Sequence, residues 1–281
     1  MAKVEGAWWK TKIIKWSKNK LLMRGYRIEE LMGNIGYGEL VYLLITGDLP
    51  YPEIARLMGA VLVAGADHGV LAPSVAASRM AASCGIPLNC CIATGVNLLG
   101  DIHGGASEQL MKLLYELEEK SRVHNIPPVR VIEEACQEFK REKRFIPGFG
   151  HPVHDDDPRV RRLFSLVEWA KGKGRVTGIY VEMTKMMAET LRELYSKSIP
   201  INVDGACAAV QCEMKLPWEC AKGLFSLSRA AGLAAEALEE FLSGSRLKGP
   251  IPPRHWETEL IYQGPEERDL PQGFKKNQGH A

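Results

Sequence analysis

Apolar residues recur every three to four positions along most of the chain, and this helical period constrains the fold more than any other feature. In the segment 107–120, for example, Leu110, Leu114 and Leu117 share one face while Glu and Lys residues lie opposite. Comparable segments predict helices over residues 38–46, 52–64, 74–83, 131–139, 160–169, 181–194 and 218–242. Strand signals are few, so we expect an all-α fold.

The clearest strand signal lies near the N-terminus. Residues 12–16 and 20–23 flank the polar turn Ser17-Lys18-Asn19 and predict a minor β-hairpin. At the other end, the residues from 263 onward are polar and rich in Gly and Pro. We therefore expect a loose C-terminal tail, with residues 266–281 as its flexible part.

Composition narrows the possible partners. The formal net charge of +2 is too small to indicate nucleic acid or a membrane surface as a partner. The longest apolar run, at about residues 58–66, is too short to cross a bilayer, and no signal-peptide stretch precedes it. Seven cysteines without a Cys-x-x-Cys pair are typical of reduced thiols in a cytosolic protein. We expect a cytoplasmic protein.

Four polar, glycine-bearing breaks interrupt the helical pattern, each where an apolar stretch meets a helix. Three of these breaks carry a histidine and one carries an aspartate, as expected when a rigid helical scaffold presents reactive side chains on loops. Taken singly, such a histidine is more often a packed residue than a catalyst, and Asp204 could be an ordinary helix N-cap. The breaks are Asp67-His68-Gly69, Asp101-Ile102-His103-Gly104-Gly105, Gly148-Phe149-Gly150-His151 and Asn202-Val203-Asp204-Gly205.

The third break also offers a possible metal site. His151 and His154 precede three consecutive aspartates, a set of side chains that could hold a divalent ion. Pro152 prevents a helical pair of histidines, and Pro158 after Asp157 is typical of a helix start. We predict a capped helix start and no metal site, with a metal-dependent hydrolase as the alternative.

In their order along the chain, these breaks and four further segments resemble the motifs of the citrate synthase superfamily. The resemblance runs from about residue 11 to about residue 262. Its segments are Arg24-Gly25-Tyr26-Arg27-Ile28-Glu29-Glu30-Leu31, Tyr42-Leu43-Leu44-Ile45-Thr46-Gly47-Asp48-Leu49-Pro50, Asp67-His68, His103-Gly104-Gly105-Ala106-Ser107-Glu108, Gly148-Phe149-Gly150-His151, Asp157-Pro158-Arg159, Asn202-Val203-Asp204 and Ser228-Arg229-Ala230-Ala231-Gly232.

The resemblance implies three catalytic residues. Asp204 would exchange a proton with the α-carbon of a CoA thioester, and His103 would donate a hydrogen bond to the thioester oxygen. His151 would serve the oxygen on the oxaloacetate-derived carbon, taking the hydroxyl proton when a bond is cleaved. Donors aimed at oxygens that gain charge stabilise a transition state by roughly a few kcal/mol each.

The resemblance also implies ligand-binding residues. His68, Arg159 and Arg229 would bind the dicarboxylate, and Arg254 would reach into the site of a partner subunit. The CoA thioester would be a substrate, and no cofactor would be permanently bound. Residues implied in CoA binding are Ile146, Pro147, Gly148, Phe149 and Gly150 through backbone groups, and Arg144 through its charge.

Within the superfamily, the short chain is similar to citryl-CoA lyase and to the C-terminal module of ATP citrate lyase. Gly69 after His68 points the same way, whereas His103 looks like its counterpart in the synthases and Pro152 replaces an arginine of many bacterial relatives. We expect cleavage of (3S)-citryl-CoA, or a close analogue, to acetyl-CoA and oxaloacetate. The alternatives are a compact citrate or 2-alkylcitrate synthase and an inactive CoA or citrate sensor.

The resemblance further implies a two-domain helical architecture. The large domain would comprise residues 1–105 and 201–265, and the small domain residues 106–200. Closure of the two domains would exclude water from an enolate between them. The expected assembly is a homodimer or a higher homo-oligomer.

Overall fold

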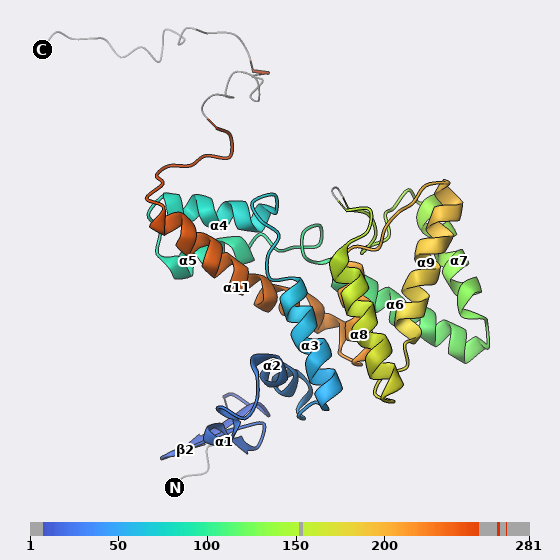
Figure 1. Ribbon diagram of the computed structural model, residues 1–281, viewed down its shortest axis with the longest axis horizontal. Coiled ribbons are helices and arrows are strands. Elements are labelled where there is room, and N and C mark those ends of the chain that lie inside the picture. Colours follow the sequence, from blue (N-terminus) through green and yellow to red (C-terminus); the bar gives the residue numbers. More distant parts are fainter. Residues whose placement is uncertain (1–7, 152–153, 253–262, 265–267, 269–281) are drawn as a thin grey trace, which may run out of the picture.

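The structure is a computed structural model that describes residues 8–151, 154–252, 263–264 and 268. Helices dominate it, as predicted (Figure 1). They are α1 (Ile28–Leu31), α2 (Tyr37–Thr46), α3 (Pro52–Ala64), α4 (Pro73–Ser83), α5 (Leu88–Val96), α6 (Ala106–His124), α7 (Pro128–Arg141), α8 (Pro158–Gly172), α9 (Ile179–Tyr195), α10 (Val203–Glu213), the 3-10 helix η1 (Trp218–Cys220) and α11 (Ala221–Leu242).

Local sequence explains where several helices begin and end. Helices α3, α4, α7 and α8 each begin at a proline, whose fixed φ suits the first helical position. Helix α2 ends at Gly47 and α6 at Asn125, both in the left-handed conformation that closes a helix. Each segment predicted to be helical lies within a helix of the structure or within η1 and α11, at slightly different bounds.

Three helices were not predicted from the period of the apolar residues. Helix α1 is a single turn, and α5 is short with small residues on several sides. Helix α10 is buried along its whole length from Gly205 to Glu213, so it has no polar face to set a period. The sequence of such a fully buried helix has no alternation of polar and apolar residues from which the helix could be predicted.

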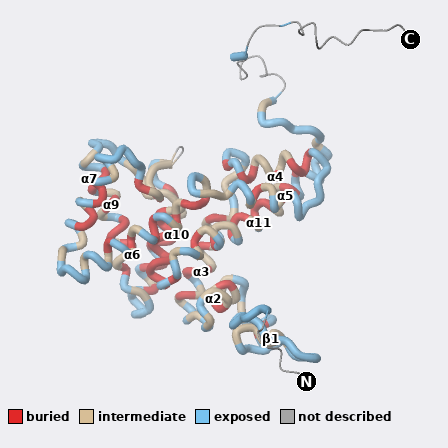
Figure 2. Tube along the Cα trace, turned by 180° about the vertical axis from the view of Figure 1, so that it is seen from behind, coloured by how far each residue is buried: buried red, intermediate tan, exposed pale blue. Residues whose placement is uncertain are grey.

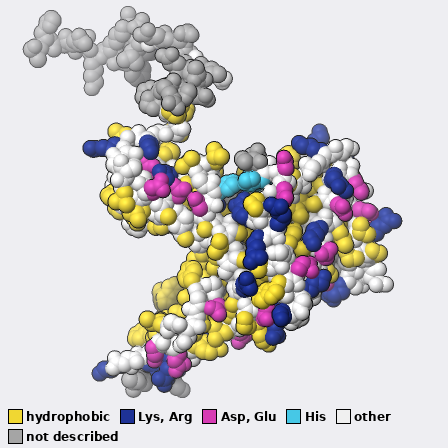
Figure 3. All heavy atoms as spheres, viewed as in Figure 1, with side chains coloured by type: hydrophobic (Ala, Val, Ile, Leu, Met, Phe, Trp, Pro, Cys, Tyr) yellow, Lys and Arg dark blue, Asp and Glu magenta, His cyan; other side chains and the backbone are white. Residues whose placement is uncertain are grey.

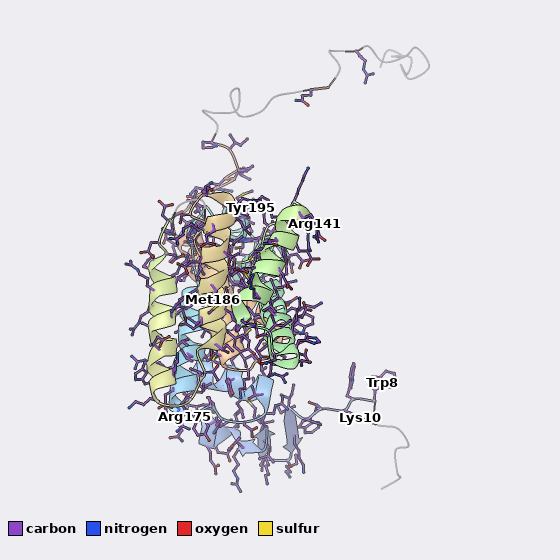
Figure 4. The ribbon with its side chains drawn as sticks, turned by 90° about the vertical axis from the view of Figure 1, so that its right-hand side faces the viewer. Trp8, Lys10, Arg141, Arg175, Met186 and Tyr195 are labelled. Carbon is purple, nitrogen blue, oxygen red and sulfur yellow. The ribbon has the colours of Figure 1, made fainter. Side chains whose placement is uncertain are left out.

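The predicted hairpin is part of a three-stranded antiparallel sheet. Strands β1 (Ile14–Ser17) and β2 (Lys20–Met23) pair with Trp16 opposite Leu21, and β3 (Tyr26–Arg27) adds to β2. The prediction missed β3 because that strand has only two residues after a tight turn. Trp8 and Lys10 lie on the segment before the sheet, which projects away from the helical body (Figure 4).

The main hydrophobic core surrounds α10. This helix packs against α6, α8, α9 and α3, and buried stretches gather where these helices meet (Figure 2). Helices α7 and α9 pack on each other at the outside, with Arg141 and Tyr195 at the same end (Figure 4). One continuous core thus links α3 with α6 to α10. The division into two domains at residues 105 and 200 remains a prediction.

Helices α4, α5 and α11 form a second lobe, separate from α6 to α9 in Figure 1. Small side chains let them approach closely, since their cluster consists of Ala81, Ala82, Cys91 and Ala237. All seven cysteines are free thiols. No helix in the described part of the chain is both long and apolar enough to span a membrane.

Candidate active site

The loop between α5 and α6 presents His103. Within this loop the Gly100 N–H donates a hydrogen bond to the His103 carbonyl at 2.8 Å, which closes the turn that carries His103. Gly104 has a φ of 87°, and a Cβ at that position would lie 2.8 Å from the ring of Phe225. Only glycine therefore fits both this backbone conformation and the contact with α11.

The imidazole of His103 is oriented by α4. Its Nε2 lies 2.9 Å from the Ser74 hydroxyl, and the Ser74 backbone N–H donates to the same nitrogen at 3.4 Å. The Nη1 of Arg229 donates to that hydroxyl at 3.2 Å. Because Nε2 accepts, the neutral ring carries its proton on Nδ1, which is then a hydrogen-bond donor. Burial, with a smaller effect from Arg229, lowers the pKa of His103 and favours this neutral form.

Backbone contacts bring the His151 loop against the start of α10. The Gly150 N–H donates to the Pro200 carbonyl at 2.7 Å, and the Asn202 N–H donates to the Gly148 carbonyl at 3.0 Å. A Cβ on Gly205 would overlap the Gly148 carbonyl, so the two loops can meet only with glycine there. These contacts place residues about fifty positions apart in sequence at one site.

Asp204 lies in the first turn of α10 and is not its N-cap. Asn202 is the cap, because its side-chain oxygen accepts from the Gly205 N–H at 3.1 Å while its amide donates to the Gly150 carbonyl at 2.9 Å. The alternative interpretation of Asp204 as a cap is therefore wrong. Its Oδ1 is buried without a hydrogen-bond partner among the described residues, although the residue as a whole is half-buried.

Burial raises the pKa of Asp204, and the positive charges of Arg229 and Arg159 oppose that rise. A hydrogen bond from Ser107 also opposes the rise. A carboxyl group with a raised pKa and one buried oxygen without a partner can hold a proton and release it to a nearby acceptor. Such a group is suited to proton exchange with carbon.

His151 belongs to a cluster of three imidazoles. The His154 backbone N–H donates to His151 Nδ1 at 2.9 Å, so the neutral His151 ring carries its proton on Nε2. Ring centroids are 5.4 Å apart for His68 and His151 and 4.6 Å apart for His151 and His154. Burial lowers the pKa of both His68 and His151, and nearby positive groups lower it further.

Two arginines flank the cluster. Arg229 is 3% exposed and also donates to the Gly65 carbonyl at 2.9 Å. Arg159 pairs with the buried Asp157, with Nη2 2.6 Å from Oδ2 and Nε 3.0 Å from Oδ1. Asp157 also accepts from the Arg159 N–H and caps α8, which confirms the predicted helix start. Neither arginine forms the exposed ion pair that is common for this residue type.

The histidines, the arginines and Asp204 surround a cavity of about 250 Å³. Figure 3 shows the histidine side chains near Lys and Arg side chains on this face of the molecule. The cavity brings together all three predicted catalytic residues and three of the four predicted dicarboxylate ligands. It is lined by His68, Leu71, Ala72, Pro73, His103, Gly104, Gly150, His151, Arg159, Asn202, Val203, Asp204, Phe225 and Arg229.

The residues predicted to bind CoA are spread over two places. Gly150 lines the cavity, whereas Arg144 and Pro147 line a hollow of about 670 Å³ between α6 and α7. The guanidinium of Arg144 lies 4.3 Å from the ring centre of Phe139 and 2.7 Å from Glu142. Arg254 lies outside the described residues.

Sequence reasoning missed three residues that shape the cavity. Phe225 lies one helical turn before Arg229, and the guanidinium carbon of Arg229 lies 5.1 Å from the centre of the Phe225 ring. The four-residue spacing from Arg229 could have identified Phe225 as a neighbour of the site. Asn202 precedes the start of α10, where an N-cap is expected. Ser74 gave no signal, because only the fold brings α4 against the His103 loop.

The three imidazoles also have to be tested as a metal site. One ligating nitrogen from each of His68, His151 and His154 lies within 4.8 Å of the other two. However, a neutral His151 whose Nδ1 accepts the His154 N–H has no lone pair left on Nε2. Arg159 and Arg229 add positive charge beside the cluster. The arrangement fits an anion or a substrate oxygen better than a cation.

Comparison with known proteins agrees with this geometry. The family profile described as "Citrate synthase, C-terminal domain" matches residues 50–250. The citryl-CoA lyase of Hydrogenobacter thermophilus superposes with a TM-score of 0.82 and 34% identity, covering 96% of this chain and 100% of that one. An ATP citrate lyase of Methanosaeta concilii in complex with (3S)-citryl-CoA superposes with a TM-score of 0.77 and 21% identity, covering 94% of this chain and 43% of that one.

The curated relatives carry a different name. The citrate synthase of Haloferax volcanii is 26% identical over 226 residues, which make up 80% of this chain and 56% of the relative. The chain spans about half the length of such relatives. The family profile covers most of the chain, and the fold and the motif order agree with it. This chain therefore belongs to the citrate synthase family.

Proposed function

We propose that the protein is a citryl-CoA lyase that cleaves (3S)-citryl-CoA, or a close analogue, to acetyl-CoA and oxaloacetate. The observation that carries the proposal is the carboxyl group of Asp204, whose Oδ1 is buried without a hydrogen-bond partner among the described residues, in one cavity with two histidine donors and two arginines. The likeness to the Hydrogenobacter citryl-CoA lyase, at 34% identity over 96% of this chain, favours cleavage as the direction.

The thioester is assigned to the His103 side of the cavity. As the carbon–carbon bond breaks, its electron pair becomes the enolate of acetyl-CoA, whose oxygen accepts a hydrogen bond from His103 Nδ1. Protonated Asp204 then delivers its proton to the α-carbon, and the carboxylate that remains regains a proton from solvent. Its raised pKa favours the protonated form that this step requires.

The oxaloacetate half is assigned to the opposite side. Arg229 and Arg159 pair with carboxylates of the substrate, and His68 adds a third donor at the same wall. His151 Nε2–H donates to the oxygen that changes from hydroxyl to carbonyl. The CoA moiety is assigned to the backbone of residues 146–150, with Arg144 near its phosphates.

A homodimer is proposed on the second lobe. Leu88 in α5, Leu98 just after it, and Leu227 and Leu238 on α11 are 40–46% exposed in a lobe that otherwise packs through small residues. The chain after α11 is held by hydrogen bonds from Leu247 and Lys248 to Ser83, at the end of α4 away from Ser74. The role of Arg254 in a partner's site is proposed from the resemblance alone, since Arg254 lies outside the described residues.

Mixing two inactive variants tests that role. Arg254→Ala subunits combined with Asp204→Asn subunits should regain part of the activity through hybrid dimers in which one site is complete. Absence of rescue after demonstrated subunit exchange would remove Arg254 from the partner's site.

The second candidate is a synthase that condenses an acyl-CoA with oxaloacetate and hydrolyses the product. The citrate synthase names of the curated relatives favour it. Product partition separates the two functions, because both use the same catalytic residues. Purified protein given citryl-CoA should form oxaloacetate, measured by coupled reduction to malate, with little free citrate. Free citrate as the main product would establish the synthase.

A further inference from the structure

Cleavage needs a group that takes the proton from the tertiary hydroxyl of the citryl group. The hydrogen bonding of His151 excludes its neutral imidazole from that role. Its Nδ1 accepts the His154 backbone N–H at 2.9 Å, so Nε2 bears the proton and can only donate. His151 can therefore hold the oxygen as negative charge develops there, but another side chain must accept the proton. The need for such an acceptor rests on the proposed lyase function.

The nearby carboxylates are committed to other partners. Asp157 is paired with Arg159 at 2.6 Å, and it also caps α8. Asp204 lies at the start of α10, where the proposed mechanism uses it in its protonated form at the α-carbon. Asp67, Asp155 and Asp156 are exposed and do not line the cavity. The remaining acceptors next to His151 are the imidazoles of His68, which lines the cavity, and His154, which lies behind that lining.

The three imidazoles can share a single oxygen atom. One ring nitrogen of each, Nδ1 or Nε2, lies within 4.8 Å of a nitrogen of the other two, and the proposal takes that of His151 to be Nε2. Any three points so spaced have a common point within 4.8/√3, or about 2.8 Å, of each, which is the length of a hydrogen bond. A hydroxyl at that point donates once and accepts twice, so it needs one accepting imidazole and two donating ones.

His154 fits the accepting role better than His68. A proton on His68 is disfavoured by burial and by the charges of Arg159 and Arg229, all of which lower its pKa. His154 stacks on His151 with a 31° tilt and 4.6 Å between ring centroids, and its half-exposed ring can pass a proton on to solvent. The charged and titratable groups around the cluster are Asp67, Asp155, Asp156, Asp157, Arg159, Asp204 and Arg229.

We propose that His154 is a catalytic residue that accepts the hydroxyl proton of the citryl group during cleavage, while His151 and His68 donate hydrogen bonds to the same oxygen. The O–H bond breaks as a proton moves to His154, the oxygen's electron pair forms the carbonyl of oxaloacetate, and the carbon–carbon electron pair leaves as the enolate. Asp204 supplies the proton for that enolate, and His154 returns its own to solvent.

The test is His154→Gln, which removes the accepting nitrogen but keeps the backbone N–H that orients His151. Cleavage should lose about 10²-fold or more in kcat, as expected for general acid–base groups, with KM changed less than about threefold. Exchange of the methyl protons of acetyl-CoA with solvent, in the presence of the unreactive dicarboxylate malate, should stay near the wild-type rate because it needs only Asp204 and His103. His124→Gln, at the exposed end of α6, is the matched control and should leave both rates unchanged.

Binding gives a second readout without turnover. Calorimetry should show that the wild type prefers citrate to propane-1,2,3-tricarboxylate, which lacks the hydroxyl, and that His154→Gln loses most of this preference. Wild-type kcat in the variant, an effect on KM alone, or equal loss of cleavage and methyl exchange would each overturn the role of His154. A wild type that neither cleaves nor condenses would instead overturn the proposed function and this inference with it.

Discussion

The two walls of the cavity differ in how their side chains are held and in the charge that they carry. On the thioester side, Ser74 fixes the imidazole of His103 through two contacts, and the charge of Arg229 reaches both His103 and Asp204. On the oxoacid side, three imidazoles lie beside two arginines, and a buried Asp157 partly balances their charge. Burial shifts pKa values on both sides toward uncharged forms, and the two arginines, which are assigned to the second side, lower the pKa of His68 and oppose the rise in that of Asp204.

This difference separates two tasks. The neutral wall can exchange a proton with carbon, because both of its acid–base groups favour their uncharged forms. The cationic wall can bind a polycarboxylate and hold an oxygen as charge develops on it. Substitutions of the acid–base groups, His103 and Asp204 on the first wall and His154 on the second, should therefore lower kcat, whereas substitutions of the two arginines should mainly raise KM.

The largest effect is expected for Asp204→Asn. An amide cannot exchange the proton, so cleavage and condensation should fall by roughly 10²- to 10⁴-fold while CoA binding is retained. Steady-state kinetics and calorimetry with CoA measure the two quantities. A variant with near wild-type turnover would remove Asp204 from the mechanism.

Arg229→Lys should weaken binding of the substrate carboxylates at the cationic wall. A lysine cannot keep both the pairing with a substrate carboxylate and the contacts with Gly65 and Ser74. We expect KM for the oxoacid to rise roughly 10- to 100-fold with a smaller change in kcat, in line with losses at buried charged hydrogen bonds. Arg161→Lys, at an exposed pair with Asp156, is the matched control. A loss confined to kcat would contradict the division of tasks.

Ser74→Ala should have an intermediate effect on the neutral wall. It removes the hydroxyl between His103 and Arg229 but leaves the backbone N–H that donates to the imidazole. A roughly tenfold lower kcat is expected, the size of one net hydrogen bond. Ser165→Ala, at an exposed serine of α8 that bonds only its own helix, should leave kinetics unchanged. Equal effects of the two substitutions would indicate a loss of stability rather than of orientation.

The pH dependence of oxoacid binding should sharpen the comparison further. In the free protein the pKa values of His68 and His151 are below the usual 6.5, so both rings are neutral at pH 7.5. A bound dicarboxylate favours their charged forms, so binding takes up protons and affinity rises as pH falls from 7.5 to 5.5. Calorimetry should show tighter binding at the lower pH, by a few-fold. His68→Gln should flatten this dependence, and weaker binding on acidification would contradict it.

The smallest effect is expected for chelation. Neither wall needs a Lewis acid for proton transfer or for anion binding, so exhaustive treatment with EDTA should leave kcat and KM unchanged. Loss of activity that zinc or manganese restores would mean that His68, His151 and His154 hold a metal in the active protein.

Much of the fold could be predicted from the sequence because most helices are amphipathic. The stripe of Leu110, Leu114 and Leu117 is one such pattern, and those residues are buried in α6. Helix α10 could not be predicted in this way, because burial on all sides removes the period. Strand β3 is too short to leave a pattern.

The site was predictable where a motif carries the reactive residue, as with His103, His151 and Asp204. It was not predictable where a contact depends on packing between distant helices. Ser74 lies far along the chain from Arg229, and only the approach of α4 to α11 brings them together. The tautomer of His151 likewise depends on a backbone hydrogen bond that no residue pattern reveals.

The most direct test of the account is cleavage of citryl-CoA in deuterium oxide, with the acetyl-CoA analysed by mass spectrometry. Asp204 exchanges its proton with solvent before turnover, so each acetyl-CoA should carry one deuterium in its methyl group and appear in equal amount with oxaloacetate. The Asp204→Asn protein should form no labelled product above background. Free citrate as the dominant product, or acetyl-CoA without deuterium, would contradict the assignment of Asp204 as the acid of a lyase.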